Sequence, residues 1–264
     1  MAFASVNGIT ISYRLAGPEK GSRLIFANAL GTDMRIWDEV VAALSPRYRI
    51  LTYDKRGHGL SDAPEGPYSL DDHVDDLLGL ADHVGFTRFG MVGVSVGGLV
   101  AQRLALRAPG RIAALVLCDT AAKVGDDALW NERIATVRAK GIAAISSSIL
   151  ESWLPQGYRE RRPADYAGWR NLLERTPLEG YIGTCATVRD ADLTEAVSGI
   201  VMPVLVVAGA EDGSTPPDLV RATAERLPKA RFEIIAGAGH IPAIDQPERL
   251  VALIASHFED VGHV

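Results

Sequence analysis

The chain has 264 residues, of which 47% are hydrophobic and 23% are charged, and its formal net charge is −6 at pH 7. This composition is ordinary for a folded enzyme and excludes a disordered chain. The negative charge and the lack of a basic stripe also disfavour a nucleic-acid-binding surface.

The sequence shows no mark of a membrane segment or an export signal. Its first residues lack a basic start followed by a long apolar run, and no apolar stretch approaches the ~20 residues that a transmembrane helix needs. The two cysteines, Cys118 and Cys185, have neither CxxC spacing nor the density of a disulfide framework. We therefore expect a cytoplasmic protein that does not bind membranes.

The first half of the chain alternates predicted strands and helices. Residues 3–15 alternate in polarity around Asn7-Gly8, which predicts an antiparallel hairpin. The apolar runs and helical periodicities that follow predict a strand at 23–27, a helix at 37–44, a strand at 48–53 and a helix at 69–84.

Residues 86–106 contain the turn around which the rest of the chain is organised. The letters Gly93-Val94-Ser95-Val96-Gly97 fit the GxSxG nucleophile elbow, and a short β-branched run precedes them while a helix-forming segment follows. Such a turn exposes the serine hydroxyl at the tip of a sheet and places the Val96 N–H at a helix start, where backbone donors lack partners. A simple glycine-rich connection is the alternative interpretation.

The pattern changes after a buried strand at 111–118. Residues 120–195 have no strand-like apolar run but show helical periodicity broken by prolines, which predicts a helical insertion. The sheet pattern then resumes, with a strand at 202–208, a helix at 217–227, a strand at 231–236 and a helix at 247–261.

This order predicts an α/β fold with a mostly parallel, doubly wound sheet, opened by an antiparallel hairpin and carrying a helical lid between two of its strands. We assign residues 1–121 and 194–264 to the core domain and residues 122–193 to the lid.

Three candidate catalytic residues follow separate predicted strands. Ser95, Asp212 and His240 lie in loops that share one edge of a parallel sheet, where ligands bind. Their order, serine then acid then histidine, is that of a hydrolase triad. Leu30, in an early strand-to-helix loop, is placed to supply a second oxyanion donor beside Val96.

Two neighbouring positions leave alternatives open. Glu211 stands beside Asp212 and could be the acid instead. His58, in an Arg-Gly-His-Gly turn, is interpreted as structural rather than catalytic. No cluster has metal-ligand spacing, and no phosphate-binding GxGxxG or Walker pattern occurs, so we expect no metal and no cofactor.

The chain as a whole resembles the α/β-hydrolase superfamily, through NALGT, YDKRGHGLSD, GVSVGG, AGAEDGSTPP and AGHIPAIDQPE. Within it, the chain is most similar to the 3-oxoadipate enol-lactonase family. The distinguishing stretches are ANALGTDMRIWD, CDTAAKVGDDALWNERIATVRAKGIAAI and TPLEGYIGTCATVRDADL, and the last two lie in or beside the lid.

The resemblance implies that Ser95 is the nucleophile, with Asp212 and His240 as its partners, and that Leu30 and Val96 form the oxyanion hole. It further implies opening of 3-oxoadipate enol-lactone to 3-oxoadipate, a step of the β-ketoadipate pathway of aromatic catabolism. That substrate is a small anionic lactone, so a cation is expected in the lid. The candidates for substrate contact are Trp130 and Arg133, with Arg189 as a weaker one; the sequence does not indicate an oligomeric state.

Two segments depart from the expected patterns, and the first of them bears on the substrate. The segment after the histidine, Ile241-Pro-Ala-Ile-Asp-Gln, is less polar than in the lactonases, and Asn28-Ala29 replaces the superfamily's common His-Gly, as in the lactonases. Alternatives are a carboxylesterase, another lactonase or a carbon–carbon bond hydrolase of the same fold. A non-catalytic small-molecule receptor is the alternative from a different class.

Overall fold

The alternation of strands and helices predicted from the sequence is present in the computed structural model, which describes residues 1–263. Across these residues the chain forms one eight-stranded sheet in the order β1-β2-β4-β3-β5-β6-β7-β8. Its strands are β1 (Ala2–Val6), β2 (Ile9–Ala16), β3 (Ser22–Ala27), β4 (Tyr48–Tyr53), β5 (Phe89–Val94), β6 (Ile112–Cys118), β7 (Val204–Gly209) and β8 (Ala230–Ile235). Strands β3 to β8 pair in parallel, whereas β2 pairs antiparallel with both β1 and β4.

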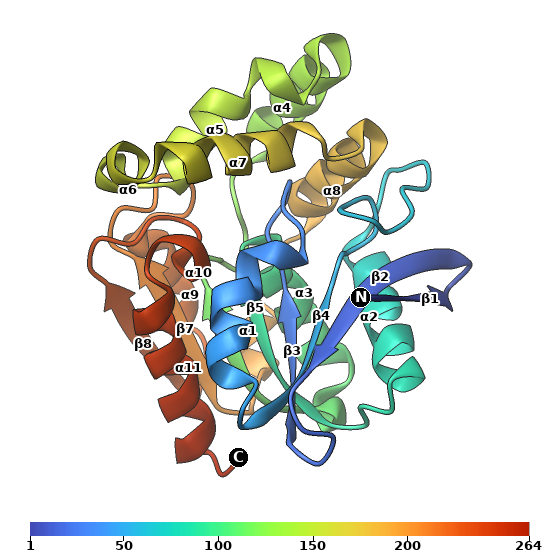
Figure 1. Cartoon of the computed structure of the whole chain (residues 1–264), viewed down its shortest axis with the longest axis vertical. Coiled ribbons are helices and arrows are strands. Elements are labelled where there is room, and N and C mark those ends of the chain that lie inside the picture. The colour runs from blue at the N-terminus through green and yellow to red at the C-terminus, as the bar shows by residue number, and fades with distance from the viewer. Residues whose placement is uncertain (264) are drawn as a thin grey trace.

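Helices cover the two faces of this sheet (Figure 1). They are α1 (Asp38–Leu44), α2 (Leu70–His83), α3 (Val96–Arg107), α9 (Pro217–Ala224), α10 (Pro242–Asp245) and α11 (Pro247–Asp260). Strands β5 and β7, neither of which is at an edge of the sheet, are buried along their whole length, as expected for parallel strands with helices on both sides. The predicted α/β-hydrolase sheet, opened by an antiparallel hairpin, is therefore confirmed.

Local sequence explains where several elements begin and end. Asn7 and Gly8 both have positive φ, of 49° and 76°, which is the backbone that a two-residue hairpin turn requires. Ser69 caps α2 in a reciprocal arrangement with Asp72, a capping box that satisfies otherwise unpaired N–H groups.

The observed elements differ from the predicted ones in small ways. Strand β7 begins at Val204 rather than at residue 202, because Pro203 has no N–H to donate to a neighbouring strand. The single-turn helix α10 was not predicted, since four residues are too few to show helical periodicity.

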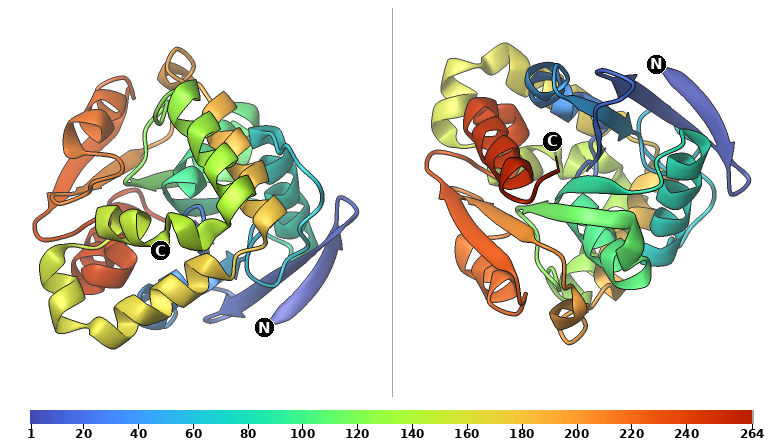
Figure 2. Two further views of the ribbon diagram at one scale, coloured as in Figure 1. Left: turned by 90° about the horizontal axis from the view of Figure 1, so that it is seen from above. Right: turned by 90° about the horizontal axis from the view of Figure 1, so that it is seen from below.

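Residues 122–193, called the helical insertion below, contain no strand in the described structure. Their helices are α4 (Asp127–Lys140), α5 (Ser146–Trp153), α6 (Gln156–Arg161), α7 (Pro163–Glu174) and α8 (Leu178–Asp190). They form a layer over the carboxyl ends of the parallel strands, seen from the side in Figure 1 and from above in Figure 2. The Leu193 N–H donates to the Ala122 C=O at 2.9 Å, so the two ends of the insertion meet. The division into core and lid stays a prediction.

No helix among residues 1–263 combines the length and the apolar character that crossing a bilayer would require. Both cysteines, Cys118 and Cys185, are buried and free.

Candidate active site

Ser95 occupies a strained turn between β5 and α3. Its φ is 56° and its ψ is −123°, a conformation that is unusual for a residue with a side chain and concentrates at functional sites. Neighbouring glycines make the turn possible: a Cβ on Gly93 would lie 2.3 Å from the Gly97 carbonyl oxygen, and a Cβ on Gly97 would lie 2.2 Å from that of Ala27. The turn thus presents the Ser95 side chain at the start of α3, and the Val96 N–H follows it there.

His240 and Asp212 form a buried pair. The His240 Nδ1 lies 2.9 Å from Asp212 Oδ2, and both side chains are almost completely inaccessible to solvent. Asp212 follows β7 and His240 follows β8, so adjacent strands bring them together. Because Nδ1 faces the carboxylate, Nε2 is the ring nitrogen left to exchange a proton with a hydroxyl.

Several donors hold the Asp212 carboxylate in its ionised form. Oδ1 accepts from the Ser214 and Thr215 N–H groups, and Oδ2 accepts from the Thr215 hydroxyl at 2.6 Å. Burial opposes ionisation, but His240 and these hydrogen bonds outweigh it, so the pKa of Asp212 is lowered. Glu211, the alternative acid, is exposed, and only Asp212 of the two forms a described hydrogen bond with His240.

The loop at residues 28–32 brings Leu30 to the same region. Gly31 has a φ of 72°, and the Leu30 N–H donates no hydrogen bond to any group within residues 1–263. The buried Lys55 side chain restrains this loop, because its Nζ donates to the Ala29 C=O at 2.5 Å. An N–H without a partner beside Ser95 and Val96 is available for a developing oxyanion.

His58 supports the loop as well. The Gly31 N–H donates to His58 Nε2 at 2.9 Å, and Nδ1 faces the Arg56 C=O at 3.1 Å. Nε2 must therefore be the unprotonated nitrogen. Burial, together with the charge of Lys55, holds the pKa of His58 well below its usual range, so the ring is neutral and fixed in one tautomer. Burial also lowers the pKa of Lys55 to about 7.

We expect His58→Ala to lower kcat about 10- to 100-fold, because a displacement of about 1 Å in a positioned group can cost that much. The substitution leaves the Gly31 N–H unpaired and loosens the loop that carries Leu30. Steady-state kinetics with a lactone or an aryl ester measures the effect, and His58→Gln, which retains a side-chain acceptor, should restore part of it. An unchanged kcat in a folded His58→Ala protein would contradict the role.

A cavity of about 330 Å³ lies between the sheet edge and the helical insertion. Five predicted site residues from the core and the insertion line it together with His240, namely Leu30, Ser95, Val96, Trp130 and Arg133. Asp212 does not line the cavity; it contacts His240 through the ring nitrogen Nδ1. The geometry can support acyl transfer: a serine hydroxyl, a histidine oriented by a carboxylate, and backbone N–H groups on one cavity.

Arg133 is the one side chain with a permanent charge among the described lining residues. Its guanidinium carbon lies 4.7 Å from the centre of the Trp130 ring, and it forms no ion pair within residues 1–263. Arg189 does not line this cavity; it pairs with Asp190 elsewhere on the insertion.

The structure adds wall residues that were not predicted. Trp153 stacks on His240, with ring centres 6.3 Å apart and planes at 27°. The Tyr181 side chain is fully buried and its hydroxyl has no hydrogen-bond partner within residues 1–263. Tyr181 lies in TPLEGYIGT, one of the stretches that carry the family resemblance, so that stretch was the available signal.

Helix α5 is bonded directly to the loops that carry Asp212 and His240. The His240 N–H donates to the Trp153 C=O at 2.8 Å, and the Gly213 N–H donates to the Ser152 C=O at 3.1 Å. The Ser152 and Ser214 hydroxyls also lie 2.9 Å apart. The insertion therefore helps to position His240 and Asp212.

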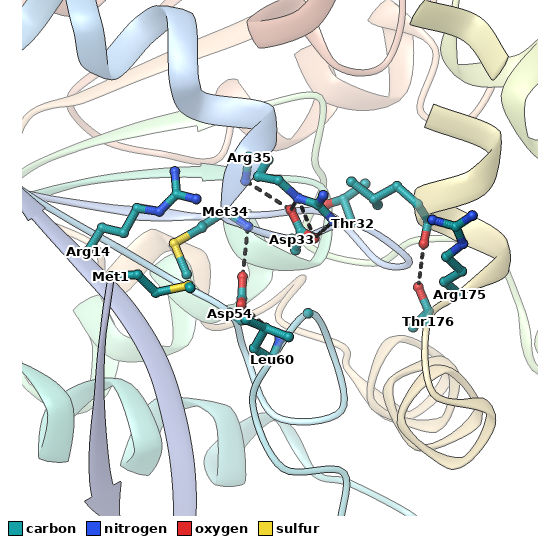
Figure 3. A pocket seen from close by; sticks show the side chains of 12 residues that line it. Met1, Arg14, Thr32, Asp33, Met34, Arg35, Asp54, Leu60, Arg175 and Thr176 are labelled. Carbon is teal, nitrogen blue, oxygen red and sulfur yellow. Dashed lines mark hydrogen bonds and ion pairs between the residues drawn. The ribbon is translucent and has the colours of Figure 1, made fainter. Parts of the chain in front are cut away.

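A second cavity, of about 410 Å³, lies beside the loop at 28–32 (Figure 3). Asp33 is paired with Arg35, and Asp54 accepts from the Met34 N–H. Serine, histidine and cysteine are absent from its described lining residues. Although it is larger, it offers no serine or cysteine next to a histidine, and we place the candidate active site in the smaller cavity.

Comparisons with known proteins identify the family of the chain. The sequence profile described as "Alpha/beta hydrolase family" matches residues 24–253. A 3-oxoadipate enol-lactonase of Acinetobacter baylyi is 32% identical over 91% of this chain and 90% of its own length. The crystal structure of the enol-lactonase from Burkholderia xenovorans LB400 superposes with a TM-score of 0.95 at 35% identity, covering 98% of this chain and 100% of that one. A thermophilic esterase from Thermogutta terrifontis, with malate bound, gives a TM-score of 0.93 at 25% identity over 100% of this chain and 99% of the esterase. With a family profile spanning most of its length, this chain belongs to the alpha/beta hydrolase family.

Proposed function

We propose that this protein is a serine hydrolase that opens 3-oxoadipate enol-lactone to 3-oxoadipate. The observation that carries the proposal is the cavity that Ser95 and His240 share, with Asp212 bonded to Nδ1 of the imidazole and Arg133 also lining the cavity. The enol-lactonases reported above support the choice of substrate.

In the first half of the reaction, His240 Nε2 accepts the Ser95 proton as the hydroxyl oxygen attacks the lactone carbonyl. The negative charge that develops on the carbonyl oxygen is bound by the Leu30 and Val96 N–H groups. Asp212 holds the imidazole in the Nδ1–H tautomer and stabilises its protonated form. The ring ester bond then breaks, and the enolate oxygen leaves.

The enolate is a good leaving group because its negative charge is delocalised, and after protonation it relaxes to a ketone. His240, which gives up its proton in that step, next takes a proton from water. The resulting hydroxide attacks the Ser95 ester, His240 returns its proton to the Ser95 oxygen as that ester bond breaks, and the acid product leaves. The sequence of steps uses only this chain's residues and water.

Arg133 is proposed to bind the free carboxylate of the substrate. Its charge is not neutralised by an acidic partner in the described structure, and Trp130 holds the guanidinium plane at the cavity wall. The buried Tyr181 hydroxyl, which lacks a partner, is a second donor that can reach an anion in this cavity.

The test is to add purified protein to freshly generated 3-oxoadipate enol-lactone and to follow the loss of enol-lactone absorbance, with 4-nitrophenyl acetate as a neutral comparison. Rapid loss of the lactone is the expected result. If the ester is cleaved while the lactone persists, the serine hydrolase proposal stands and the lactonase proposal fails. If neither is cleaved, both fail and a receptor function becomes the better hypothesis.

We expect Arg133→Met to raise KM for the anionic lactone about 10- to 100-fold, since a hydrogen bond to a charged group contributes about 1.5–3 kcal/mol. Its KM for 4-nitrophenyl acetate should change by no more than about twofold, because that ester has no carboxylate. Arg189→Met is the matched control, since it removes an arginine outside the cavity. Equal changes for both substrates would show that Arg133 shapes the cavity rather than binding the anion.

A carboxylesterase is the second candidate, favoured by the likeness to the Thermogutta terrifontis esterase. The same residues would perform the same steps on an acyclic ester. The comparison of the lactone with 4-nitrophenyl acetate separates the two candidates.

A further inference from the structure

Asp119 is a buried carboxyl group that the proposed mechanism does not use. It directly follows β6, and its N–H extends the sheet by donating to the Val207 C=O of β7 at 2.8 Å. Its φ is 47°, in the left-handed region where aspartate and asparagine are enriched among residues with a side chain. The residue is completely inaccessible to solvent.

The two oxygens of Asp119 have different surroundings. Oδ1 accepts a hydrogen bond from the Gly209 N–H at 2.6 Å. Oδ2 is buried and receives no hydrogen bond from any donor group within residues 1–263. A buried carboxylate oxygen without a donor is costly, whereas a protonated oxygen needs only an acceptor.

The Asp212 carboxylate is the nearby group that could accept a hydrogen bond from a protonated Asp119 Oδ2. Both residues are bonded to Gly209: Asp119 Oδ1 accepts from its N–H, and the Asp212 N–H donates to its C=O at 3.2 Å. Two carboxylates have only acceptor atoms, so these neighbouring side chains can bond to each other only through a proton. Two buried carboxylates on neighbouring loops disfavour each other's charge, so we expect one carboxyl of the pair to hold a proton.

Asp212 is the ionised member of the pair. It accepts from the Ser214 and Thr215 N–H groups, from the Thr215 hydroxyl and from His240, whereas Asp119 accepts from Gly209 alone. Burial, and after it the negative charge of Asp212, raise the pKa of Asp119 well above its ordinary value.

We propose that Asp119 holds a proton on Oδ2 and donates it to the Asp212 carboxylate, as a positioning residue that fixes this carboxylate toward His240. The bond reduces the negative charge that His240 experiences and adds one more donor to those from Ser214, Thr215 and His240 that restrain the carboxylate. The catalytic part of this inference rests on the proposed function; the protonation of Asp119 does not.

Other titratable groups face the pair. Asp245 on α10 adds negative charge near both carboxyls; burial is the main cause that raises its pKa to about 7, and its Oδ2 accepts from the Gly239 N–H. The Cys118 thiol is buried beside Asp119, and burial raises its pKa well above the ordinary value. Glu211 also raises the pKa of Asp245. A comparison of variants at position 119 leaves all three groups in place.

The experiment compares the wild type with Asp119→Asn and Asp119→Gly in two measurements, the Tm between pH 5 and pH 8 and the pH profile of 4-nitrophenyl acetate hydrolysis. The asparagine amide keeps a donor toward Asp212 and an acceptor for Gly209 but cannot ionise. Glycine removes both interactions and tolerates the left-handed φ.

The Tm reports the protonation state without reference to catalysis. A carboxyl whose pKa is raised by folding must take up a proton as the chain folds above the unfolded-state pKa of about 3.9, so its contribution to stability is lost as the pH rises. We therefore expect Asp119→Asn to have a higher Tm than the wild type at pH 8, with the difference shrinking toward pH 5. A Tm difference that does not change with pH would overturn the proposal.

The pH profile reports the effect on His240. With Asp119→Asn we expect the acidic limb to stay in place, whereas Asp119→Gly should lower kcat about tenfold and move that limb to higher pH, because Asp212 then stabilises the protonated imidazole more strongly. If Asp119 is instead ionised, Asp119→Asn removes a negative charge and moves the limb to lower pH, which overturns the proposal. A wild-type profile in Asp119→Gly overturns the positioning role. If the wild-type protein does not hydrolyse the ester, the proposed function fails, and the Tm comparison still decides whether Asp119 is protonated.

Discussion

Replacing Ser95 by alanine is expected to reduce kcat for the lactone by about 10⁶-fold, as the loss of the nucleophile does in other serine hydrolases. Without the hydroxyl no ester intermediate can form, and only binding and the oxyanion donors remain. The protein should still fold and bind substrate, since the strained turn is set by the Gly93 and Gly97 contacts rather than by the side chain. Loss of enol-lactone absorbance measures the rate, and thermal unfolding checks the fold.

A serine-reactive phosphonate gives an independent measure of the same prediction. It should add one adduct to the wild type, detected by intact mass, and none to Ser95→Ala. The control is Ser148→Ala, which removes a hydroxyl from the same cavity that is already donated to the Ile145 C=O and should leave kcat within about threefold of the wild type. An adduct that persists in Ser95→Ala would assign the nucleophile to another residue.

Replacing Asp212 by alanine is expected to lower kcat by about 10⁴-fold, equivalent to about 5.5 kcal/mol of transition-state stabilisation. The loss has two causes. His240 no longer has a carboxylate to select the Nδ1–H tautomer, and its protonated form in the transition state is left in a buried site without a counter-charge. Asp212→Asn should lose activity for the same reasons while disturbing the packing less.

Glu211→Ala tests the alternative acid directly. Glu211 is adjacent in sequence but exposed, so its removal should change kcat by no more than about twofold. The kcat values of the two alanine variants, measured on one substrate at one pH, decide between the acids. A larger loss in Glu211→Ala than in Asp212→Ala would contradict the assignment made from the structure.

Much of the sheet could be predicted because periodicity and turn chemistry act locally. The apolar runs of the inner parallel strands are short and bounded by turn residues, so their approximate extents and their order along the chain follow from the sequence. Ser95, Asp212 and His240 could be grouped for the same reason, since each follows a strand and the ends of parallel strands meet at one edge. Their roles in catalysis remain predictions.

The part of the cavity wall that the helical insertion supplies was harder to predict. Helical periodicity locates α5 and α8 in the sequence, but it does not set how far each helix is rotated or shifted over the sheet. Trp153 and Tyr181 reach the cavity through those tertiary contacts. Asp119 could not be predicted for another reason: its surroundings depend on a left-handed turn and on Asp212, which lies 93 positions further along the chain.

The bonds between α5 and the loops that carry Asp212 and His240 have a consequence for chimaeric proteins. Transplanting the entire helical insertion from a relative would also replace the Ser152 and Trp153 carbonyls that accept from the Gly213 and His240 N–H groups. If α5 of that relative is shifted, the transplant would displace Asp212 and His240 as well as change the residues that line the cavity. Helix α4 is a safer unit to exchange. It carries Trp130 and Arg133, and it is flanked by Gly125 and Gly141, both with positive φ. New substrate preferences can therefore be grafted at α4 while the scaffold that aligns the reacting groups is kept intact.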